Sequence, residues 1–277
     1  MKQTISRERL EKTAKLADAV RLVFGVLPEG RTCVLETEAM KGSVAEAYDE
    51  LGKKSRSSTY KKIVRDFLQR VKWKGNGGKT IIDVGCGSGL LAIELAKQTD
   101  AVVVGFDVSE DMINLAKRNL EQNTLSIKNP ERIEFFRGSV YALRKFFCRK
   151  PFADYVICRN ALHRFERPSL ALRQMYSSLK EGGSIYLRDL RRDADWNVIV
   201  ERIGNQRWER PELVKDYVGA MAGMMTVDEL KKVLERIRIT DYSIPDNGEY
   251  LVKDSGVSKD LDERTKEVDY VCIIGKS

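Results

Sequence analysis

Apolar runs alternate with amphipathic stretches of helical period from residue 80 to residue 189. The runs have the length of buried strands, and the stretches between them repeat apolar residues every three or four positions. The predicted strands are 80–84, 101–106, 132–136, 153–158 and 184–189, and the predicted helices are 89–98, 109–121, 140–147 and 168–180. This alternation predicts an α/β fold with a mostly parallel twisted sheet and helices on both faces.

Three helical segments are expected before the first strand. The first runs from about Ser6, a plausible N-cap, to Gly25. The other two show a one-sided apolar pattern, formed by Met40, Val44, Tyr48 and Leu51 and then by Tyr60, Ile63, Val64, Phe67, Leu68 and Val71. We therefore predict an N-terminal helical cap or lid over residues 1–75 and a sheet domain over 76–277.

The strand and helix pattern loosens after Asp189. Residues 191–225 contain two tryptophans and a Met-Met pair without a clear sheet element, and we predict an insertion that serves as a substrate lid. A capping box beginning at Thr226 starts a helix that reaches Ile237. Two last strands are expected at 238–244 and 268–275.

The composition indicates which class of protein and which cellular compartment to expect. Of the 277 residues, 42% are hydrophobic and 32% charged, which is typical of a soluble globular protein. No apolar run approaches the length that crosses a bilayer, and Arg21 interrupts the N-terminal apolar stretch, so neither a membrane span nor a signal peptide is expected. The five cysteines are scattered without a C-x-x-C pair, which favours a reducing cytoplasm over a disulfide framework or a zinc site.

The net charge of +8 is concentrated in one segment. Residues 52–79 hold ten Lys and Arg and a single acidic residue, Asp66. Such a patch could attract a nucleic acid or an anionic substrate. A solvated helix face explains it more simply, because exposed aromatic residues are not interleaved with the basic ones and no recognised nucleic-acid module accompanies them.

A glycine turn follows the first predicted strand. The stretch Ile81-Ile82-Asp83-Val84-Gly85-Cys86-Gly87-Ser88-Gly89 ends a buried strand in a carboxylate and has glycine at every second position before a helix. Absent side chains let a ligand approach the backbone closely. A dinucleotide fingerprint spaces its glycines G-x-G-x-x-G instead. A second carboxylate, Asp107, ends the next strand 22 residues after Gly85, at the distance of a ribose contact. The pattern indicates a nucleoside ligand without a diphosphate.

These motifs resemble a class I S-adenosylmethionine-dependent methyltransferase with a Rossmann-like domain. The likeness rests on Asp83 to Gly89 and on Gly105-Phe106-Asp107-Val108-Ser109. It continues through Arg159-Asn160-Ala161-Leu162-His163-Arg164-Phe165 and Leu179-Lys180-Glu181-Gly182-Gly183, which resemble the subgroup of ubiquinone/menaquinone C-methyltransferases and many small-molecule enzymes. The resemblance covers about residues 40 to 190 and implies S-adenosylmethionine as the cofactor.

The resemblance also implies roles for the motif residues. Asp83 orders the glycine turn and receives the amino group of the methionine moiety, although it could instead cap the following helix. Asp107 accepts both ribose hydroxyls, with helix capping as the alternative, and Val108 lies on an adenine face. The remaining expected cofactor contacts are Gly85, Cys86, Gly87, Met112, Ser139, Val140 and Asn160.

Two positions depart from the family. Ser139 stands where an Asp commonly binds the adenine amine, which weakens that hydrogen bond by about 1 kcal/mol. Arg164 replaces a second histidine next to His163, the only histidine of the chain. We still expect S-adenosylmethionine as the cofactor, because the backbone amide of Val140 can donate a hydrogen bond to an adenine ring nitrogen.

Four side chains are candidates for the chemistry. His163 could act as a general base or simply tie down its loop. Arg159 could bind an anionic substrate or pair with a local carboxylate, and Asp189 could orient the substrate or contact the arginines that follow it. Tyr48 is expected on a lid over the line of methyl transfer.

The predicted activity is transfer of a methyl group to a small molecule by in-line displacement. An RNA or protein methyltransferase that docks through residues 52–79 is the first alternative, and a non-catalytic S-adenosylmethionine-binding protein is the second. The chain lacks an Asn-Pro-Pro-Tyr-like tetrad, a proline before Cys158 and a metal triad. This speaks against N6-adenine or glutamine methylation, a cysteine-nucleophile mechanism and a metal-dependent catechol enzyme.

Overall fold

The computed structural model describes residues 40–55, 57–75, 77–147, 150–194, 213, 216, 220, 223–245 and 269–276. The helix predicted from Ser6 to Gly25 lies outside these residues, as do Trp196 and Trp208 of the predicted lid. No helix in the described part of the chain has the length and apolar character that crossing a membrane requires.

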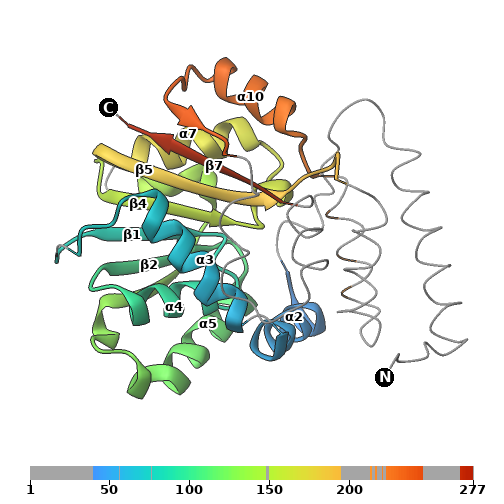
Figure 1. Cartoon of the computed structure of the whole chain (residues 1–277). Coiled ribbons are helices and arrows are strands. Elements are labelled where there is room, and N and C mark those ends of the chain that lie inside the picture. The colour runs from blue at the N-terminus through green and yellow to red at the C-terminus, as the bar shows by residue number, and fades with distance from the viewer. Residues whose placement is uncertain are drawn as a thin grey trace, which may run out of the picture.

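One sheet of seven strands forms the centre of the described chain, in the order β3-β2-β1-β4-β5-β7-β6. The strands are β1 (Thr80–Val84), β2 (Val102–Asp107), β3 (Ile133–Arg137), β4 (Ala153–Arg159), β5 (Leu179–Leu190), β6 (Tyr242–Ser243) and β7 (Asp269–Gly275). Neighbours among β1 to β5 are parallel, whereas β7 runs antiparallel to both β5 and β6. The predicted mostly parallel α/β sheet is confirmed (Figure 1).

Helices and short 3-10 turns connect the strands. The helices are α2 (Gly42–Ser55), α3 (Ser57–Arg70), α4 (Leu90–Gln98), α5 (Glu110–Asn123), α6 (Leu143–Phe146), α7 (Pro168–Ser178) and α10 (Val227–Arg236). The 3-10 turns are η2 (Thr124–Ser126), η3 (Pro130–Arg132), η4 (Val140–Ala142) and η5 (Leu162–Arg164). The predicted capping box opens α10, where the Thr226 side chain accepts from the Glu229 amide at 3.1 Å.

Both faces of the sheet are covered because side chains alternate along each strand. Ile81 packs with the apolar residues of α3, α4 and α5 on one face. Its neighbour Ile82 packs with those of α6, α7 and α10 on the other face. The expected helices on both faces are therefore present, and the strand order reverses direction between β1 and β4. In open sheets of this kind, ligands bind at the carboxyl ends of the strands at that switch point.

The two helices before the glycine turn pack in different places. Phe67 of α3 is fully buried against the sheet, with its ring edge-on to Tyr155 and Tyr186 at centroid distances of 5.8 and 5.7 Å. Helix α2 lies beside α5, where Ala45 packs on Met112 (Figure 1). Helix α3 thus shares the core of the sheet, although the sequence places it in the N-terminal cap. The division of the chain at residue 75 remains a prediction.

Two predicted strands have other bounds. The strand expected at 238–244 is reduced to Tyr242–Ser243, because Arg238 has a left-handed φ of 61° and Ile239 turns into the core. The strand expected at 184–189 begins earlier, at Leu179, and its pairing with β4 shifts register between Ala153 and Tyr155. A shift of this kind is not encoded in apolar periodicity.

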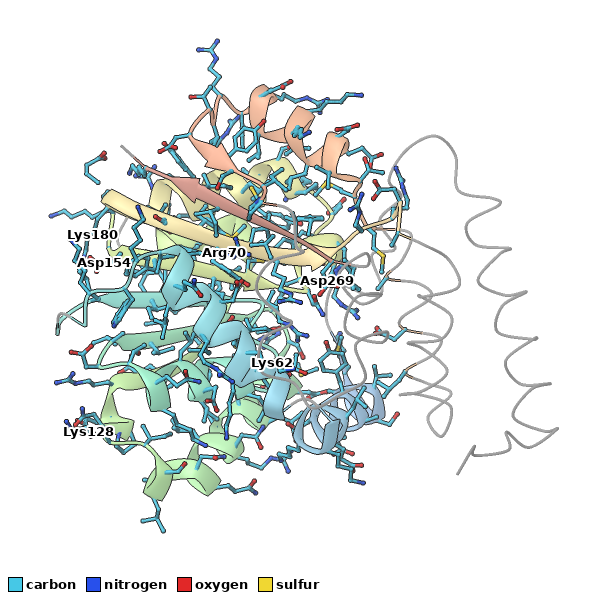
Figure 2. All side chains as sticks on the ribbon, viewed as in Figure 1. Lys62, Arg70, Lys128, Asp154, Lys180 and Asp269 are labelled. Carbon is cyan, nitrogen blue, oxygen red and sulfur yellow. The ribbon has the colours of Figure 1, made fainter. Side chains whose placement is uncertain are left out.

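Ion pairs occupy the amino end of the sheet. Asp154 accepts hydrogen bonds from Lys79 Nζ at 3.0 Å, Lys180 Nζ at 2.9 Å and the Thr80 amide at 2.9 Å (Figure 2). On α3, Arg70 Nε donates to Asp66 at 2.9 Å. Part of the basic segment 52–79 is therefore neutralised within the fold.

Candidate functional site

A cavity of about 900 Å³ lies at the carboxyl ends of the parallel strands. This volume includes the mouth of the cavity, which is open to solvent. Every residue predicted to contact the cofactor lines it, together with two of the candidates for the chemistry: Tyr48, Asp83, Gly85, Cys86, Gly87, Asp107, Val108, Met112, Ser139, Val140, Arg159 and Asn160. Sequence motifs from four separate loops therefore meet at one cavity.

The glycine turn has a backbone that other residues would strain. Gly85 has a φ of 71°, and a Cβ there would lie 2.5 Å from the Cβ of Ala161. Gly87 has a φ of 53°, and its amide donates to Asp107 Oδ2 at 2.9 Å. Since left-handed backbone is costly for other L-residues, glycine is required for the shape of the turn.

Asp83 is a buried carboxylate with an unsatisfied oxygen. It is 1% exposed, and its Oδ2 has no hydrogen-bond partner among the described residues. Burial, and next the negative charge of Asp107, raise its pKa to about 7, while Arg159 acts in the opposite direction. An unpaired buried oxygen is unfavourable, so a cationic donor inside the cavity would complete the site.

Asp107 is fixed by backbone amides on both sides. Its Oδ2 accepts from Gly87 N, and its Oδ1 accepts from the Ser109 amide at 2.9 Å. Burial raises its pKa, and these two hydrogen bonds oppose the shift. The N-cap of α5 is instead Ser109, whose hydroxyl accepts from Met112 N at 3.2 Å. A carboxylate can accept about four hydrogen bonds, so Asp107, which lines the cavity, can accept more than these.

Two residues of the later loops, Ser139 and Asn160, also line the cavity. Ser139 caps η4, and its hydroxyl accepts from the Tyr141 amide at 3.3 Å. Asn160 has a φ of 52°, which asparagine tolerates better than most residues. Its buried Oδ1 has no hydrogen-bond partner in the described part of the chain, as at Asp83.

Arg159 and two tyrosines form another part of the cavity lining. The guanidinium carbon of Arg159 lies 5.4 Å from the centroid of the Tyr60 ring, within the range of a cation–π contact. Tyr48 reaches the same cavity from α2. Sequence reasoning missed Tyr60 and Phe165 as lining residues, because an aromatic on an apolar helix face or in a loop looks like an ordinary core residue.

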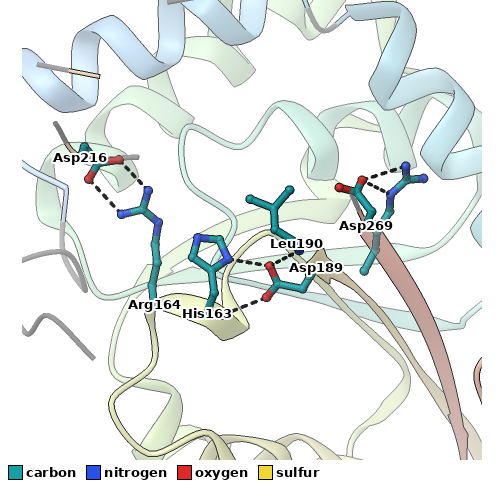
Figure 3. Close-up of polar contacts among 7 residues, drawn as sticks. His163, Arg164, Asp189, Leu190, Asp216 and Asp269 are labelled. Atoms are coloured by element: carbon teal, nitrogen blue, oxygen red, sulfur yellow. Dashed lines mark hydrogen bonds and ion pairs between the residues drawn. The ribbon is translucent and has the colours of Figure 1, made fainter. Parts of the chain in front are cut away.

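His163 and Asp189, expected to face the substrate, do not line the cavity. They are buried against each other, with His163 Nδ1 2.5 Å from Asp189 Oδ1 and the His163 amide donating to Asp189 Oδ2 at 2.9 Å (Figure 3). The arginines after Asp189 bind elsewhere, Arg191 to Asp193 and Arg192 to Glu229. The geometry agrees with the alternative in which His163 ties down its loop.

Arg164 lines the cavity next to that pair. Its guanidinium makes a two-point ion pair with Asp216, at 3.0 and 2.6 Å (Figure 3). Asp216 belongs to the predicted lid insertion 191–225, whose ends are joined by a parallel bridge between Arg191 and Met225. Arg164, which stands where the resemblance implies a second histidine, thus binds a residue within this range of the chain.

The described residues contain no group of His, Cys, Asp and Glu that could hold a metal ion.

The chain matches a family model described as a methyltransferase domain over residues 76–238. It is 32% identical over 117 residues to the ubiquinone biosynthesis O-methyltransferase of Coxiella burnetii (strain RSA 493 / Nine Mile phase I), which covers 42% of this chain and 45% of that protein. It is 30% identical over 125 residues to the same-named protein of Haemophilus ducreyi, which covers 44% of this chain and 50% of that protein.

The chain therefore spans about half the length of the curated relatives it matches. A solved structure with the same fold is the plantazolicin methyltransferase BpumL in complex with SAH. It superposes with a TM-score of 0.61 at 19% identity, over 98% of this chain and 100% of that one. This likeness supports the fold alone.

Proposed function

Because this chain belongs to the methyltransferase domain family, we propose that it transfers the methyl group of S-adenosylmethionine to a small molecule. The observation that carries this proposal is the pair of carboxylates, buried Asp83 and half-buried Asp107, that line one cavity with the glycine turn. The curated relatives are named as methyltransferases of ubiquinone biosynthesis, which supports a small acceptor.

The residues of the cavity fit this cofactor. Asp83 Oδ2 would accept from the amino group of the methionine moiety, which removes the unfavourable unpaired oxygen. The remaining lone pairs of Asp107 would accept from the ribose hydroxyls. Ser139 and the Val140 amide would contact the adenine, with Val108 on one ring face and Cys86, Gly87 and Met112 close by.

When bound, the cofactor supplies a methyl group that its sulfonium already activates. The chain's own residues then have to align the acceptor and exclude water. Arg159, Tyr48 and Tyr60 line the rest of the cavity and would hold the acceptor in line with the methyl group, while Asn160 would contact the cofactor. Because His163 is buried against Asp189, we assign both a supporting role for the loop that carries Arg159 and Asn160.

Binding and transfer are tested in two steps. Titration calorimetry should detect binding of both S-adenosylmethionine and S-adenosylhomocysteine. Absence of binding at millimolar concentration would refute the proposal that this protein uses the cofactor. Incubation of a cell extract with labelled S-adenosylmethionine, with and without the protein, should place new label in the small-molecule fraction. No transfer would favour a non-catalytic binding protein.

The extract experiment also distinguishes a small-molecule acceptor from an RNA or protein acceptor. Lys61 and Arg65 are exposed on α3, on the side away from the sheet core, so a docking surface for RNA or protein stays testable. Label in the RNA or protein fraction, lost when Lys61, Lys62 and Arg65 are changed to Glu, would replace the small-molecule proposal.

A further inference from the structure

We propose that Asn119, in the second half of α5, is a positioning residue that couples the glycine turn to helix α2, so that cofactor binding and docking of α2 stabilise each other. This inference rests on the proposed placement of the cofactor against the glycine turn. It does not depend on the identity of the methyl acceptor.

One buried amide group joins the two elements. Asn119 is fully buried, and its Nδ2 donates to the Ser88 carbonyl at 2.8 Å and to Asp49 Oδ1 at 2.7 Å. Both partners can only accept, so the amide must present its NH₂ group to them. The two acceptors lie 31 and 70 residues away in the sequence, one in the glycine turn and the other on α2.

One end of this link lines the cavity, and the other end is next to a residue that does. Ser88 lines the cavity between Gly87 and Gly89. Asp49 follows Tyr48, which lines the cavity from α2. The other oxygen of Asp49 pairs with Lys53 Nζ at 2.8 Å, which holds the carboxylate in place on the helix.

The start of α2 is tied to the same helix. The Gly42 amide donates to Asp111 Oδ2 at 2.7 Å, and the Met40 carbonyl accepts from the Ser109 hydroxyl. Ser109 also binds Asp107 Oδ1 through its amide, so the segment before α2 contacts the loop that would hold the ribose. Helix α5 therefore supports α2 and the cofactor loops together.

An asparagine at position 119 is unfavourable for local stability, and packing alone does not explain why it is there. Its Oδ1 is buried and finds no hydrogen-bond donor in the described residues. An asparagine inside a helix is also a weaker helix former than leucine. An apolar residue would satisfy the packing without leaving an oxygen unpaired, so the NH₂ group accounts for the residue at this position.

Calorimetry with S-adenosylhomocysteine tests the coupling in the full-length protein. Asn119→Leu removes a neutral hydrogen bond to the Ser88 carbonyl and one to the Asp49 carboxylate, and it should weaken binding by about three- to tenfold. Asn123→Leu is the matched control, because Asn123 lies one turn further along α5 and bonds to the Asn119 carbonyl and Lys97 instead. It should bind as the parent does.

Hydrogen exchange supplies the readout that a purely structural role would not move. S-adenosylhomocysteine should protect the amides of residues 42–55 in the parent and in Asn123→Leu, and this protection should be lost in Asn119→Leu. Asp49→Asn keeps an oxygen that can accept from Asn119 and should retain the protection, whereas Asp49→Ala should lose it. The comparison of Asp49→Asn with Asp49→Ala tests the coupling even if Asn119→Leu fails to fold.

Two outcomes would overturn the proposal. One is a parent in which the nucleoside leaves the exchange of α2 unchanged, and the other is an Asp49→Ala variant that keeps full affinity and full protection. Failure of the cofactor placement is recognised separately, because Asp107→Ala would then bind S-adenosylhomocysteine as tightly as the parent.

Discussion

Replacing Asp83 by asparagine should remove most of the pH dependence of cofactor binding between pH 6 and pH 8. Burial and the nearby Asp107 raise the pKa of Asp83 to about 7, so its carboxyl is partly protonated at neutral pH in the cofactor-free protein. In the proposed placement, the cationic amino group of the cofactor would bind the ionised form of Asp83. The affinity of the parent should therefore rise with pH and level off as Asp83 becomes fully ionised.

The expected magnitude follows from this pKa. With a value of about 7, roughly one-tenth of Asp83 is ionised at pH 6 and roughly nine-tenths at pH 8, so affinity should increase about tenfold. Asparagine keeps an oxygen but loses the charge assistance of a contact worth about 1.5–3 kcal/mol. The variant should therefore bind more weakly than the parent at pH 8, and the difference should shrink by about tenfold at pH 6.

Titration calorimetry with S-adenosylmethionine at half-unit pH steps measures how the affinity of the parent and that of Asp83→Asn change with pH. Asp154→Asn is the control, since Asp154 lies at the amino end of the same strands. Burial alone would raise the pKa of Asp154, but hydrogen bonds from Lys180, the Thr80 amide and Lys79 hold it below its ordinary value. It should not titrate in this range. A flat profile for the parent, or the parent's slope in Asp83→Asn, would show that Asp83 does not carry the linkage.

Three further predictions address the site and the core. Asp107→Ala should lower cofactor affinity about ten- to a hundredfold by calorimetry with unchanged circular dichroism, because the ribose loses charge-assisted hydrogen bonds. His163→Ala should leave affinity within about twofold of the parent's but lower the midpoint of thermal unfolding, because it removes a buried partner of Asp189 and no cavity contact. Phe67→Ala should reduce the free energy of unfolding in urea by about 3–5 kcal/mol, and a loss below about 1 kcal/mol would contradict the place of α3 in the core.

Local patterns predicted the central strands and helices because each of them has its own signal. The alternation of apolar runs and amphipathic stretches placed β1 to β4 within one or two residues. The register shift beside Ala153 and the left-handed Arg238 depend on contacts between distant segments, so strand bounds near them were wrong. Periodicity identified α3 as a helix but gave no indication that Phe67 inserts between Tyr155 and Tyr186.

The cavity was predictable to the extent that its residues follow strand ends. Asp83, Asp107, Ser139 and Asn160 each lie at or within three residues of the end of a predicted strand, and parallel strands bring their carboxyl ends to one edge. The contribution of Tyr60 and the burial of His163 could not be predicted in this way. They depend on how α3 and Asp189 pack against that edge, which no spacing in the sequence encodes.

The burial of His163 changes which acceptors suit the proposed reaction. Asp189 accepts from the His163 and Leu190 amides and lies against the imidazole, so it joins the end of β5 to the loop after β4. That loop brings Arg159 and Asn160 to the cavity, so we propose that the pair supports their alignment. Without a histidine at the cavity, we expect acceptors that are nucleophilic before the methyl group moves, such as a neutral amine, a thiolate or an ionised phenol. The rate should then follow the ionisation of the acceptor and of Asp83, and His163→Ala should leave the shape of the pH–rate profile unchanged.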